Sequence, residues 1–253
     1  MNNPLISIIT VVYNGSTTLE QTIQSVLNQT YKNIEYIVID GGSTDGTLDI
    51  IKNYESHINY WISEPDKGLY DAMNKGISVA KGELIGMINS DDWYESNAVE
   101  LIVKTYYNNP RKRIFHGDRY DILGNGNKSI RKFHPSKFKF LYYGMMYNHP
   151  SMFFHKEIYK HELYNIELKA LSDYEFVLKQ YLTDKNQFQY VNSIPYVNYR
   201  LDGVSSRMSL KQSLFEGYRA RKNAGLILTK NVMAFILRLS VFAVYKLKYL
   251  VVR

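Results

Sequence analysis

The 253-residue sequence contains no cysteine, and it lacks both a secretory signal and an apolar segment long enough to cross a bilayer. The lack of cysteine excludes a disulfide framework, a Cys-ligated zinc site and a thiol nucleophile, and it fits a reducing compartment. The first residues, Met1-Asn2-Asn3-Pro4, have no positive charge ahead of the apolar run that follows. We therefore expect a cytoplasmic protein.

Two nucleotide-binding fingerprints are also missing. The Gly-rich loop of residues 40–47 lies between a predicted strand and a predicted helix, so its backbone N–H groups could face an anion. However, no Gly-Lys-Ser/Thr follows it, and the G-x-G-x-x-G spacing is absent. The sequence therefore lacks the motifs that would usually indicate ATP hydrolysis or dinucleotide binding.

Hydrophobic residues make up 45% of the chain and charged residues 22%, which is ordinary for a globular protein. Aromatic residues reach 14%, with 23 tyrosines. This content suits a protein that stacks rings against sugars, although the same rings could simply fill a core.

The net charge of +7 is unevenly distributed. Residues 205–253 contain ten Lys or Arg residues and a single acid, Glu216, so this segment carries +9. Residues 1–204 carry −2. A uniformly basic nucleic-acid-binding protein is therefore disfavoured, and we expect no nucleic-acid partner.

The first 120 residues alternate strand-like and helix-like segments, and a capping box of Thr17 and Glu20 is expected to open the first helix. The predicted strands are 5–13, 34–39, 60–63 and 84–89, and the predicted helices are 17–28, 48–54, 69–80 and 97–107. The order βαβαβαβ predicts a parallel sheet covered by helices. Its carboxyl edge would then carry Asn14, Asp40, Asp66 and Asp91.

The pattern loosens after Pro110. Residues 114–122 and the turn Gly124-Asn125-Gly126-Asn127 predict a hairpin, and a helix is expected around residues 172–181. No internal repeat or low-complexity linker is visible. We therefore divide the chain into one domain over residues 1–204, with a nucleotide-type half (1–110) and a second half that completes the site (111–204), and a basic helical segment over residues 205–253.

The sequence Asn89-Ser90-Asp91-Asp92 places two carboxylates directly after an apolar strand. Such carboxylates can present oxygen ligands to a hard divalent ion whose other ligands are phosphate oxygens and water. The alternative is an Asx turn or an N-cap for the helix that follows. The pair alone does not decide between them.

Four motifs in order resemble the family 2 glycosyltransferases of the GT-A fold. They are Val11-Val12-Tyr13-Asn14, Ile39-Asp40-Gly41-Gly42-Ser43-Thr44-Asp45-Gly46-Thr47, Asp66-Lys67-Gly68-Leu69-Tyr70-Asp71-Ala72-Met73-Asn74-Lys75-Gly76 and Asn89-Ser90-Asp91-Asp92. The resemblance extends more loosely to residues 148–151, 171–175 and 199–205. It implies a Rossmann-like, mostly parallel α/β sheet flanked by helices, and an enzyme dependent on a nucleotide sugar.

The resemblance also implies roles for individual residues on the donor side. Asp40 would accept the N–H of a uracil or similar base, and Asp91 would ligate a divalent cation, Mn²⁺ or Mg²⁺, that bridges to the donor diphosphate. The other implied donor contacts are Tyr13, Asn14, Gly42, Asp66, Lys67, Asn89 and Ser90. Because Asn89 stands where the family usually has Asp, metal dependence is expected to be looser.

On the acceptor side, Asp173 resembles the catalytic base of the family, with Glu175 as the neighbouring rival. Without the upstream motifs, Asp173 would read as an acid at the start of a surface helix. Asp92, His149 and Arg200 are weaker candidates for acceptor or phosphate contacts, because a lone residue near a turn is more often structural.

The C-terminal segment predicts a basic amphipathic helix. On a helical wheel, Lys230, Arg238, Lys246, Lys248 and Arg253 share one side, and the opposite side is apolar apart from one serine. Such a helix can lie in a membrane interface. The alternative is a helix docked on the domain or in a homo-oligomer.

Taken together, the sequence predicts an inverting glycosyltransferase that moves a sugar from a nucleoside diphosphate donor, with UDP-sugar expected, to a glycan or lipid-linked acceptor. The expected setting is surface polysaccharide assembly, peripheral to the inner face of the cell membrane. Two alternatives are a nucleotidyltransferase that makes activated sugars and a carbohydrate-binding protein without turnover.

Overall fold

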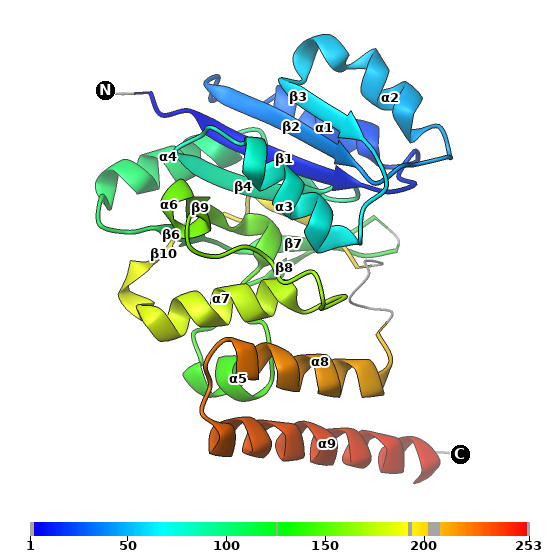
Figure 1. Ribbon diagram of the computed structural model, residues 1–253, viewed down its shortest axis with the longest axis vertical. Coiled ribbons are helices and arrows are strands. Elements are labelled where there is room, and N and C mark those ends of the chain that lie inside the picture. Colours follow the sequence, from blue (N-terminus) through cyan, green and yellow to red (C-terminus); the bar gives the residue numbers. More distant parts are fainter. Residues whose placement is uncertain (1–2, 125, 192–193, 202–207, 252–253) are drawn as a thin grey trace.

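The computed structural model describes residues 3–124, 126–191, 194–201 and 208–251, with side chains through residue 242. Its centre is a seven-stranded sheet of order β10-β6-β9-β4-β1-β2-β3 (Figure 1). The strands are β1 (Ile6–Val12), β2 (Ile34–Asp40), β3 (Tyr60–Ser63), β4 (Leu84–Asn89), β6 (Ile114–His116), β9 (Phe153–His155) and β10 (Phe188–Tyr190). Only β9 runs against the others, because it pairs antiparallel with β4 and β6. The predicted mostly parallel α/β fold is confirmed.

Helices cover both faces of the parallel strands. They are α1 (Leu19–Leu27), α2 (Thr47–Asn53), the short η1 (Glu55–His57), α3 (Leu69–Val79) and α4 (Ala98–Asn108). Alternate residues of β1 point to opposite faces, so Ile9 and Val11 join the core that contains α3, whereas Ile8 and Val12 join the core of α1, α2 and α4. The predicted order of elements in this half is confirmed.

The start of α1 differs from the expected capping box. Thr18, not Thr17, is the N-cap residue, and no side chain caps the helix. The N–H groups of Thr18 and Leu19 donate instead to the carbonyl of Gly15. The carboxylate of Glu20 accepts a hydrogen bond from the Tyr54 hydroxyl at 2.8 Å, so it is not available to the backbone of the first turn.

The predicted strand at residues 114–122 is two strands in two different sheets. After β6 the chain leaves the large sheet and forms β7 (Arg119–Ile122), which pairs antiparallel with β8 (Lys128–Arg131). Gly117 lies where the chain passes from the large sheet to the second sheet. A Cβ atom at this position would be 2.5 Å from Tyr196 Cε1. The hairpin itself is confirmed as β7–β8, although residue 125 of its turn lies outside the described residues.

A second sheet of order β5-β11-β7-β8 is completed by β5 (Trp93–Tyr94) and β11 (Val197–Arg200). Since β5 follows β4 by three residues, this sheet lies next to the end of the parallel strands. The remaining elements of this half are α5 (Lys137–Tyr142), η2 (His149–Ser151), α6 (Lys156–Tyr159), α7 (Ser172–Thr183) and η3 (Lys185–Gln187). The predicted helix at 172–181 corresponds to α7.

The C-terminal segment forms two helices, α8 (Leu210–Asn223) and α9 (Leu228–Val251). In Figure 1, α8 lies beneath α7 and beside α5, and α9 lies beneath α8 and α5. Arg221 of α8 is fully buried, and its Nε donates a 2.9 Å hydrogen bond to Oδ1 of Asn231 in α9. Ala234 of α9 is fully buried as well. The first turns of α9 are therefore packed onto the domain.

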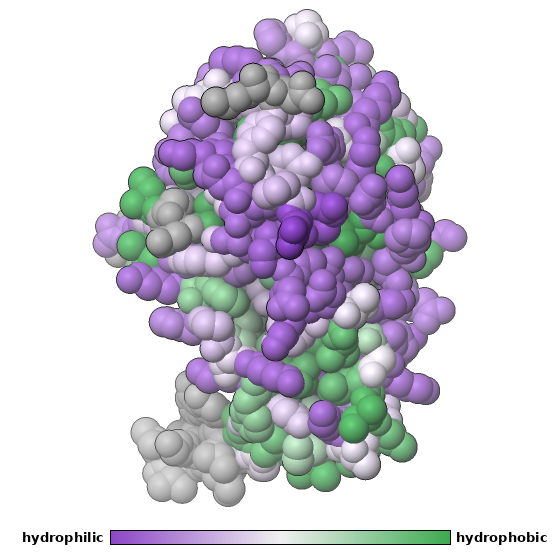
Figure 2. All heavy atoms as spheres, turned by 90° about the vertical axis from the view of Figure 1, so that its left-hand side faces the viewer, coloured by the Kyte–Doolittle hydropathy of each residue, from purple (hydrophilic) through white to green (hydrophobic). Residues whose placement is uncertain are grey.

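The outward side of α9 is apolar in its described part. Its exposed apolar residues are Leu228, Val232, Met233, Ile236, Leu239, Val241 and Phe242. Figure 2 shows hydrophobic side chains gathered at the end of the molecule where the C-terminal helices lie. Arg238 turns inward, where its guanidinium donates to the Tyr143 carbonyl and to Ser213 Oγ. The attachment of this basic helix to a membrane stays a prediction. Among the described helices, none is long and apolar enough to span a membrane.

Candidate active site

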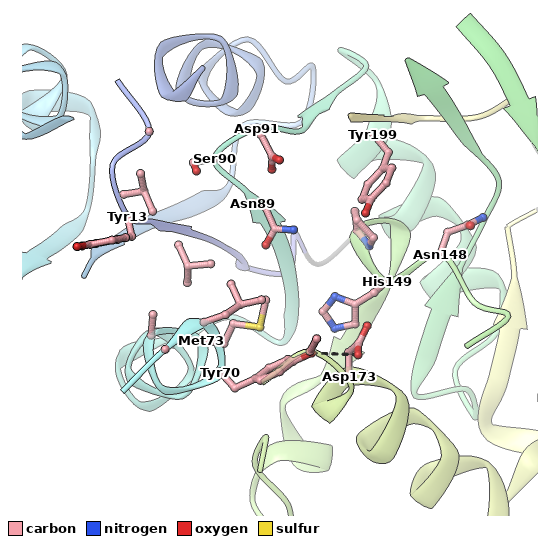
Figure 3. Close-up of a pocket in the computed structure, with 18 of the residues that line it drawn as sticks. Tyr13, Tyr70, Met73, Asn89, Ser90, Asp91, Asn148, His149, Asp173 and Tyr199 are labelled. Atoms are coloured by element: carbon pink, nitrogen blue, oxygen red, sulfur yellow. Dashed lines mark hydrogen bonds between the residues drawn. The ribbon is translucent and has the colours of Figure 1, made fainter. Parts of the chain in front are cut away.

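A pocket of about 660 Å³ opens at the carboxyl ends of β1 and β4 and reaches the start of α7 (Figure 3). Its lining residues come from segments 11–18, 66–73, 89–91, 145–150 and 170–173, together with Arg119, Arg131 and Tyr199. Ligands of open α/β sheets bind at this edge of the strands. The pocket therefore lies where the strand order predicted it.

The loop after β1 lines the pocket with Tyr13 and Asn14. Asn14 has a left-handed backbone (φ 51°), and its Oδ1 accepts a hydrogen bond from Thr44 N at 2.9 Å. Its own N–H donates to Ser43 Oγ at 2.7 Å. These bonds fix the loop to the Gly-rich loop after β2, and they leave the Tyr13 ring 66% exposed.

Asp40 and Gly42 do not line the pocket. Oδ2 of the fully buried Asp40 accepts hydrogen bonds from the N–H groups of Gly42 and Ser43 and from Ser63 Oγ, and Oδ1 accepts from Ser43 Oγ. The carboxylate therefore holds the Gly-rich loop in shape. Direct recognition of a base by Asp40 would need this loop to move.

The turn before α3 contributes Asp66 and Gly68 to the pocket, but not Lys67. Asp66 Oδ1 accepts a 2.7 Å hydrogen bond from Gly68 N, which has a positive φ of 115°. The exposed Lys67 lies outside the lining, and its N–H donates to Asp71 Oδ2. In this geometry the turn, and not the Lys67 side chain, faces the pocket.

Asn89, Ser90 and Asp91 line the pocket directly after β4. Within the described part of the chain, no three His, Asp or Glu side chains gather into a metal site. A cation such as Mg²⁺ is commonly held by one or two carboxylates together with water and substrate phosphates. The Asp91 carboxylate and the Asn89 amide oxygen therefore fit a cation that arrives with a diphosphate, and they do not fit a tightly held structural metal.

Asp92 and Arg200 support this turn from outside the pocket. Asp92 is fully buried, and its Oδ1 accepts a 3.0 Å hydrogen bond from Arg200 N. Burial, reinforced by the neighbouring Asp91 charge, raises the pKa of Asp92 well above its ordinary value. The Arg200 guanidinium donates to the Asp91 carbonyl and lies 4.7 Å from the centre of the Trp93 ring. Both residues therefore position Asp91. The motif residues 202–205 lie outside the described residues.

Asp173, the second residue of α7, lines the opposite end of the pocket (Figure 3). Its Oδ1 accepts a 3.1 Å hydrogen bond from the Tyr70 hydroxyl and a 2.8 Å bond from Tyr174 N. Burial, together with the Asp173 charge, raises the pKa of Tyr70, so the phenol keeps its proton. Among the described residues, no hydrogen bond to Asp173 Oδ2 is found, which leaves this oxygen for a ligand.

His149 lines the pocket close to Asp173, and Figure 3 shows both side chains pointing into the same space. Its Nε2 is 2.9 Å from the Tyr164 hydroxyl, and the Tyr164 ring stacks on Tyr70 with centroids 5.8 Å apart. Burial lowers the pKa of His149, although the Asp173 charge opposes this shift. The imidazole is therefore neutral near pH 7 and can exchange hydrogen bonds with a sugar hydroxyl.

The rival base Glu175 faces away from the pocket. Its side chain accepts hydrogen bonds from Asn165 Nδ2 and, at 3.0 Å, from Asn223 Nδ2 of α8. Burial raises its pKa. One turn of helix separates residues that are three or four apart, so a residue two positions after Asp173 points to a different side of α7. Glu175 is therefore a link between helices, not a base.

The lining residues that were not predicted as site residues include four with polar or aromatic side chains that carry an argument below: Tyr70, Arg119, Arg131 and Tyr199. Tyr70 lies within the third motif, but the motif did not indicate a role for its side chain. Arg119 and Arg131 lie on β7 and β8, where no motif marks them. They reach the pocket because β7 pairs with β11 in the second sheet, a pairing between strands about 80 residues apart.

The model for glycosyl transferase family 2 matches residues 7–165. The chain belongs to this family. It is 34% identical over 188 residues to an uncharacterized glycosyltransferase of Mycobacterium tuberculosis, an alignment that covers 70% of the chain and 68% of the relative. It is 30% identical over 197 residues to the chondroitin synthase of Pasteurella multocida, covering 76% of the chain and 20% of that synthase. The chain thus spans about a fifth of the length of the synthase.

Solved structures of glycosyltransferases share the fold. TarS of S. aureus in complex with UDP superposes with a TM-score of 0.70 at 18% identity, covering 93% of this chain and 70% of TarS. The mannosyltransferase PcManGT of Pyrobaculum calidifontis, in complex with GDP-Man and Mn²⁺, gives 0.59 at 14% identity, covering 96% and 76%. The chain is therefore a member of glycosyl transferase family 2 with the GT-A fold, which favours a glycosyltransferase over the nucleotidyltransferase and the carbohydrate-binding protein.

Proposed function

We propose that this family 2 enzyme transfers a sugar, with inversion, from a nucleoside diphosphate donor to a hydroxyl of a glycan or lipid-linked acceptor. The observation that carries the proposal is the placement of two carboxylates in one pocket. Asp91 lies at the end of β4 among the donor-side residues, and Asp173 lies at the start of α7 with Oδ2 directed to no other group among the described residues. One carboxylate can hold a leaving group, and the other can take a proton.

The chemistry assigned to Asp173 is general base catalysis. Oδ2 accepts the proton of the acceptor hydroxyl while the acceptor oxygen forms a bond to C1 of the donor sugar. The bond between C1 and the diphosphate oxygen breaks, and its electron pair leaves with the diphosphate. A single displacement of this kind inverts the anomeric centre. A positioned base contributes roughly 10² to 10⁴ in rate.

The donor is expected to lie along the loops after β1 and β4. The exposed ring of Tyr13 offers a stacking surface for a base, and the solved structure of TarS with UDP supports a uridine nucleotide. Asp91 and Asn89 would hold a divalent cation, which when bound supplies positive charge to the departing diphosphate. The loop held by Asp40 would flank the base.

The setting proposed is polysaccharide assembly on the inner face of the cell membrane. The named relatives include chondroitin and hyaluronan synthases of Pasteurella multocida. The outward apolar side of α9 suits a membrane surface, and those Lys and Arg residues of segment 205–253 other than the buried Arg221 and the inward-turned Arg238 suit an anionic one. The one acid of this segment, Glu216, accepts hydrogen bonds from Lys169 N and Ala170 N, so it is engaged within the protein.

The base assignment is tested with Asp173→Asn and the matched control Glu175→Gln. With UDP-sugar donor and an accepted glycan, Asp173→Asn should bind the donor normally and lose roughly 10² to 10⁴ in kcat. Glu175→Gln should keep near wild-type kcat. Near wild-type turnover by Asp173→Asn would remove the base from this position and make His149 the next residue to test.

The donor class is tested by thermal shift with UDP, GDP and their sugars, with and without Mn²⁺. A nucleotide held at 100 times its Kd adds about 2.7 kcal/mol to the free energy of unfolding. We expect a rise in Tm with a uridine nucleotide and Mn²⁺. No rise with any nucleoside diphosphate would contradict the proposed donor.

Membrane attachment is tested by flotation with vesicles that contain anionic phospholipid. The double variant Ile236→Glu/Leu239→Glu places charge on the outward side of α9, and it should lose flotation. Transfer to a soluble acceptor should persist, because neither residue lines the pocket. If wild type does not float but forms a dimer that the double variant abolishes, the surface of α9 is an oligomer interface instead.

A further inference from the structure

Charge is segregated between the walls of the pocket. Asp66 and Asp91 lie on the donor side, after β3 and β4, whereas Arg119 and Arg131 lie on the β7–β8 hairpin. On the donor side, the proposed cation and diphosphate would neutralise one another. Arg119 also acts on the buried Asp92 of the β4 turn, but Arg131 lies on the far strand of the hairpin, so we looked for a different negative group that it could bind.

A single carboxylate, that of Asp121, serves both arginines. Its Oδ1 is 2.7 Å from Arg119 Nε, and its Oδ2 is 3.9 Å from Arg131 Nη1. Arg119 is largely buried and lies 3.8 Å from the centre of the Tyr199 ring, which fixes its orientation. The Arg131 side chain is 60% exposed, and its ion pair is at the outer limit of contact. The hairpin therefore presents an excess positive charge at the pocket.

The segment that contains and follows β8 adds further positive charge. Residues 122–156 contain six Lys or Arg residues and no Asp or Glu. Of these, Lys128 is paired with Glu95 at 2.8 Å. Lys132, Lys137 and Lys139 are exposed. This segment also supplies residues 145–150 of the pocket wall, so the acceptor side combines one carboxylate, Asp173, with an excess of positive charge from the hairpin and its neighbours.

We propose that the acceptor of this enzyme is anionic, and that Arg131, backed by Arg119, binds a carboxylate or phosphate group close to the reacting hydroxyl. The inference rests on the proposed glycosyl transfer and names the chemical class of its acceptor. Guanidinium groups match carboxylate and phosphate in a two-bond, planar geometry, which a neutral sugar cannot offer. A neutral acceptor would leave the exposed charge of Arg131 without use.

The test uses the full chain and matched oligosaccharide acceptors: one ending in a hexuronate, its carboxyl-reduced neutral counterpart, and a phosphate-bearing counterpart. Calorimetry measures their binding in the presence of UDP, and initial rates with saturating donor give the KM of each acceptor. Wild type should prefer an anionic acceptor over the neutral one by about tenfold or more, since a charge-assisted pair of this kind is worth roughly that factor. The hexuronate and phosphate arms show which anion is preferred.

Arg131→Gln should abolish this preference while the KM of the donor stays unchanged, and Arg131→Lys should restore it only in part because lysine lacks the planar fork. Lys104→Gln, on the exposed side of α4, is the matched control and should behave as wild type. Equal binding of neutral and anionic acceptors by wild type would overturn the inference. So would a rise in donor KM in Arg131→Gln without any change in acceptor preference, because Arg131 would then serve the diphosphate.

Failure of the proposed function looks different. In that case no variant and no acceptor gives nucleoside diphosphate release, whereas the calorimetric preference for anions can still be measured. If the enzyme is active but binds anionic and neutral acceptors equally well, only the inference of an anionic acceptor is overturned, and the proposed glycosyl transfer stands.

Discussion

The hydroxyl of Tyr70 donates a 3.1 Å hydrogen bond to Oδ1 of Asp173, joining the second residue of α3 to the second residue of α7. Since α3 begins directly after the Asp66–Gly68 turn, this bond ties the proposed base to the element that borders the proposed donor site. We therefore expect Tyr70 to be a positioning residue that keeps Oδ2 of Asp173 open to the pocket.

Tyr70→Phe should lower kcat by about tenfold, because a hydrogen bond to a charged group is worth roughly 1.5–3 kcal/mol. The KM of the donor should change little, since the ring remains in place. Steady-state kinetics with both substrates varied measures the two effects separately. Tyr107→Phe on α4 is the control. An equal loss in donor binding would show that Tyr70 shapes the donor site instead.

The two neighbouring acids of the β4 turn should behave differently. Asp91→Asn should weaken Mn²⁺-dependent nucleotide binding by roughly 10- to 100-fold, because it removes the one pocket-lining carboxylate of this turn. Asp92→Asn keeps an oxygen acceptor for Arg200 N and resembles the protonated acid that a raised pKa favours. It should bind nucleotide as wild type does. Titration of nucleotide at several Mn²⁺ concentrations distinguishes them, and equal losses would place Asp92 on the metal.

Stability should fall in mild acid because of His116. Burial in a ring of aromatic side chains lowers the pKa of His116 to about 3, and its Nδ1 has no partner among the described residues. The unfolded chain binds a proton near pH 6.5, so it holds more protons than the folded state between that pH and about 3. This contribution to stability is present above pH 6.5 and is lost as the pH falls below it, by up to about 1.4 kcal/mol per pH unit.

His116→Phe should reduce this slope, even if it changes stability at pH 7. Urea unfolding at pH 7, 6 and 5 gives the slope for wild type and variant. The exposed His57, replaced by Gln, is the control and should leave the slope unchanged. Parallel slopes for wild type and His116→Phe would mean that the buried imidazole takes up its proton without unfolding.

Asn231 should be essential for seating α9. Asn231→Ala leaves Nε of the buried Arg221 without a partner and should lower the free energy of unfolding by about 2–3 kcal/mol. Ser240→Ala removes only an exposed bond to the Leu237 carbonyl within the same helix, and it should cost little. Chemical denaturation measures both. A negligible effect of Asn231→Ala would indicate that α9 does not stay docked in solution.

The donor half was predictable because its signals are local. Runs such as Ile6–Val12 are short and rich in β-branched residues, which favours strands buried on both faces, and the Gly-rich and Asp-rich segments after them mark the carboxyl ends. Strand β3 and strand β4 were predicted to the residue. The edge that gathers Asn14, Asp66 and Asp91 then follows from the handedness of the crossovers.

The acceptor half was not predictable to the same depth, because its geometry depends on distant pairings. Nothing in residues 114–122 shows that Gly117 must pass beside Tyr196, which splits one apparent strand between two sheets. Likewise, the choice between Asp173 and Glu175 needed the position of Asn223 on α8, which removes Glu175 from the pocket. The contact between Tyr70 and Asp173 spans 103 residues and leaves no trace in either local motif.

In the proposed binding mode, donor and acceptor are recognised by two different sheets, which the chain connects at Gly117. Among the described strands, the β7–β8 hairpin belongs to a different sheet from β1 and β4, so a change in the hairpin leaves the register of the parallel strands intact. A hairpin grafted from another family member is then expected to change the preferred acceptor while the donor is retained. Short, exchangeable segments of this kind would let one scaffold form different glycan linkages.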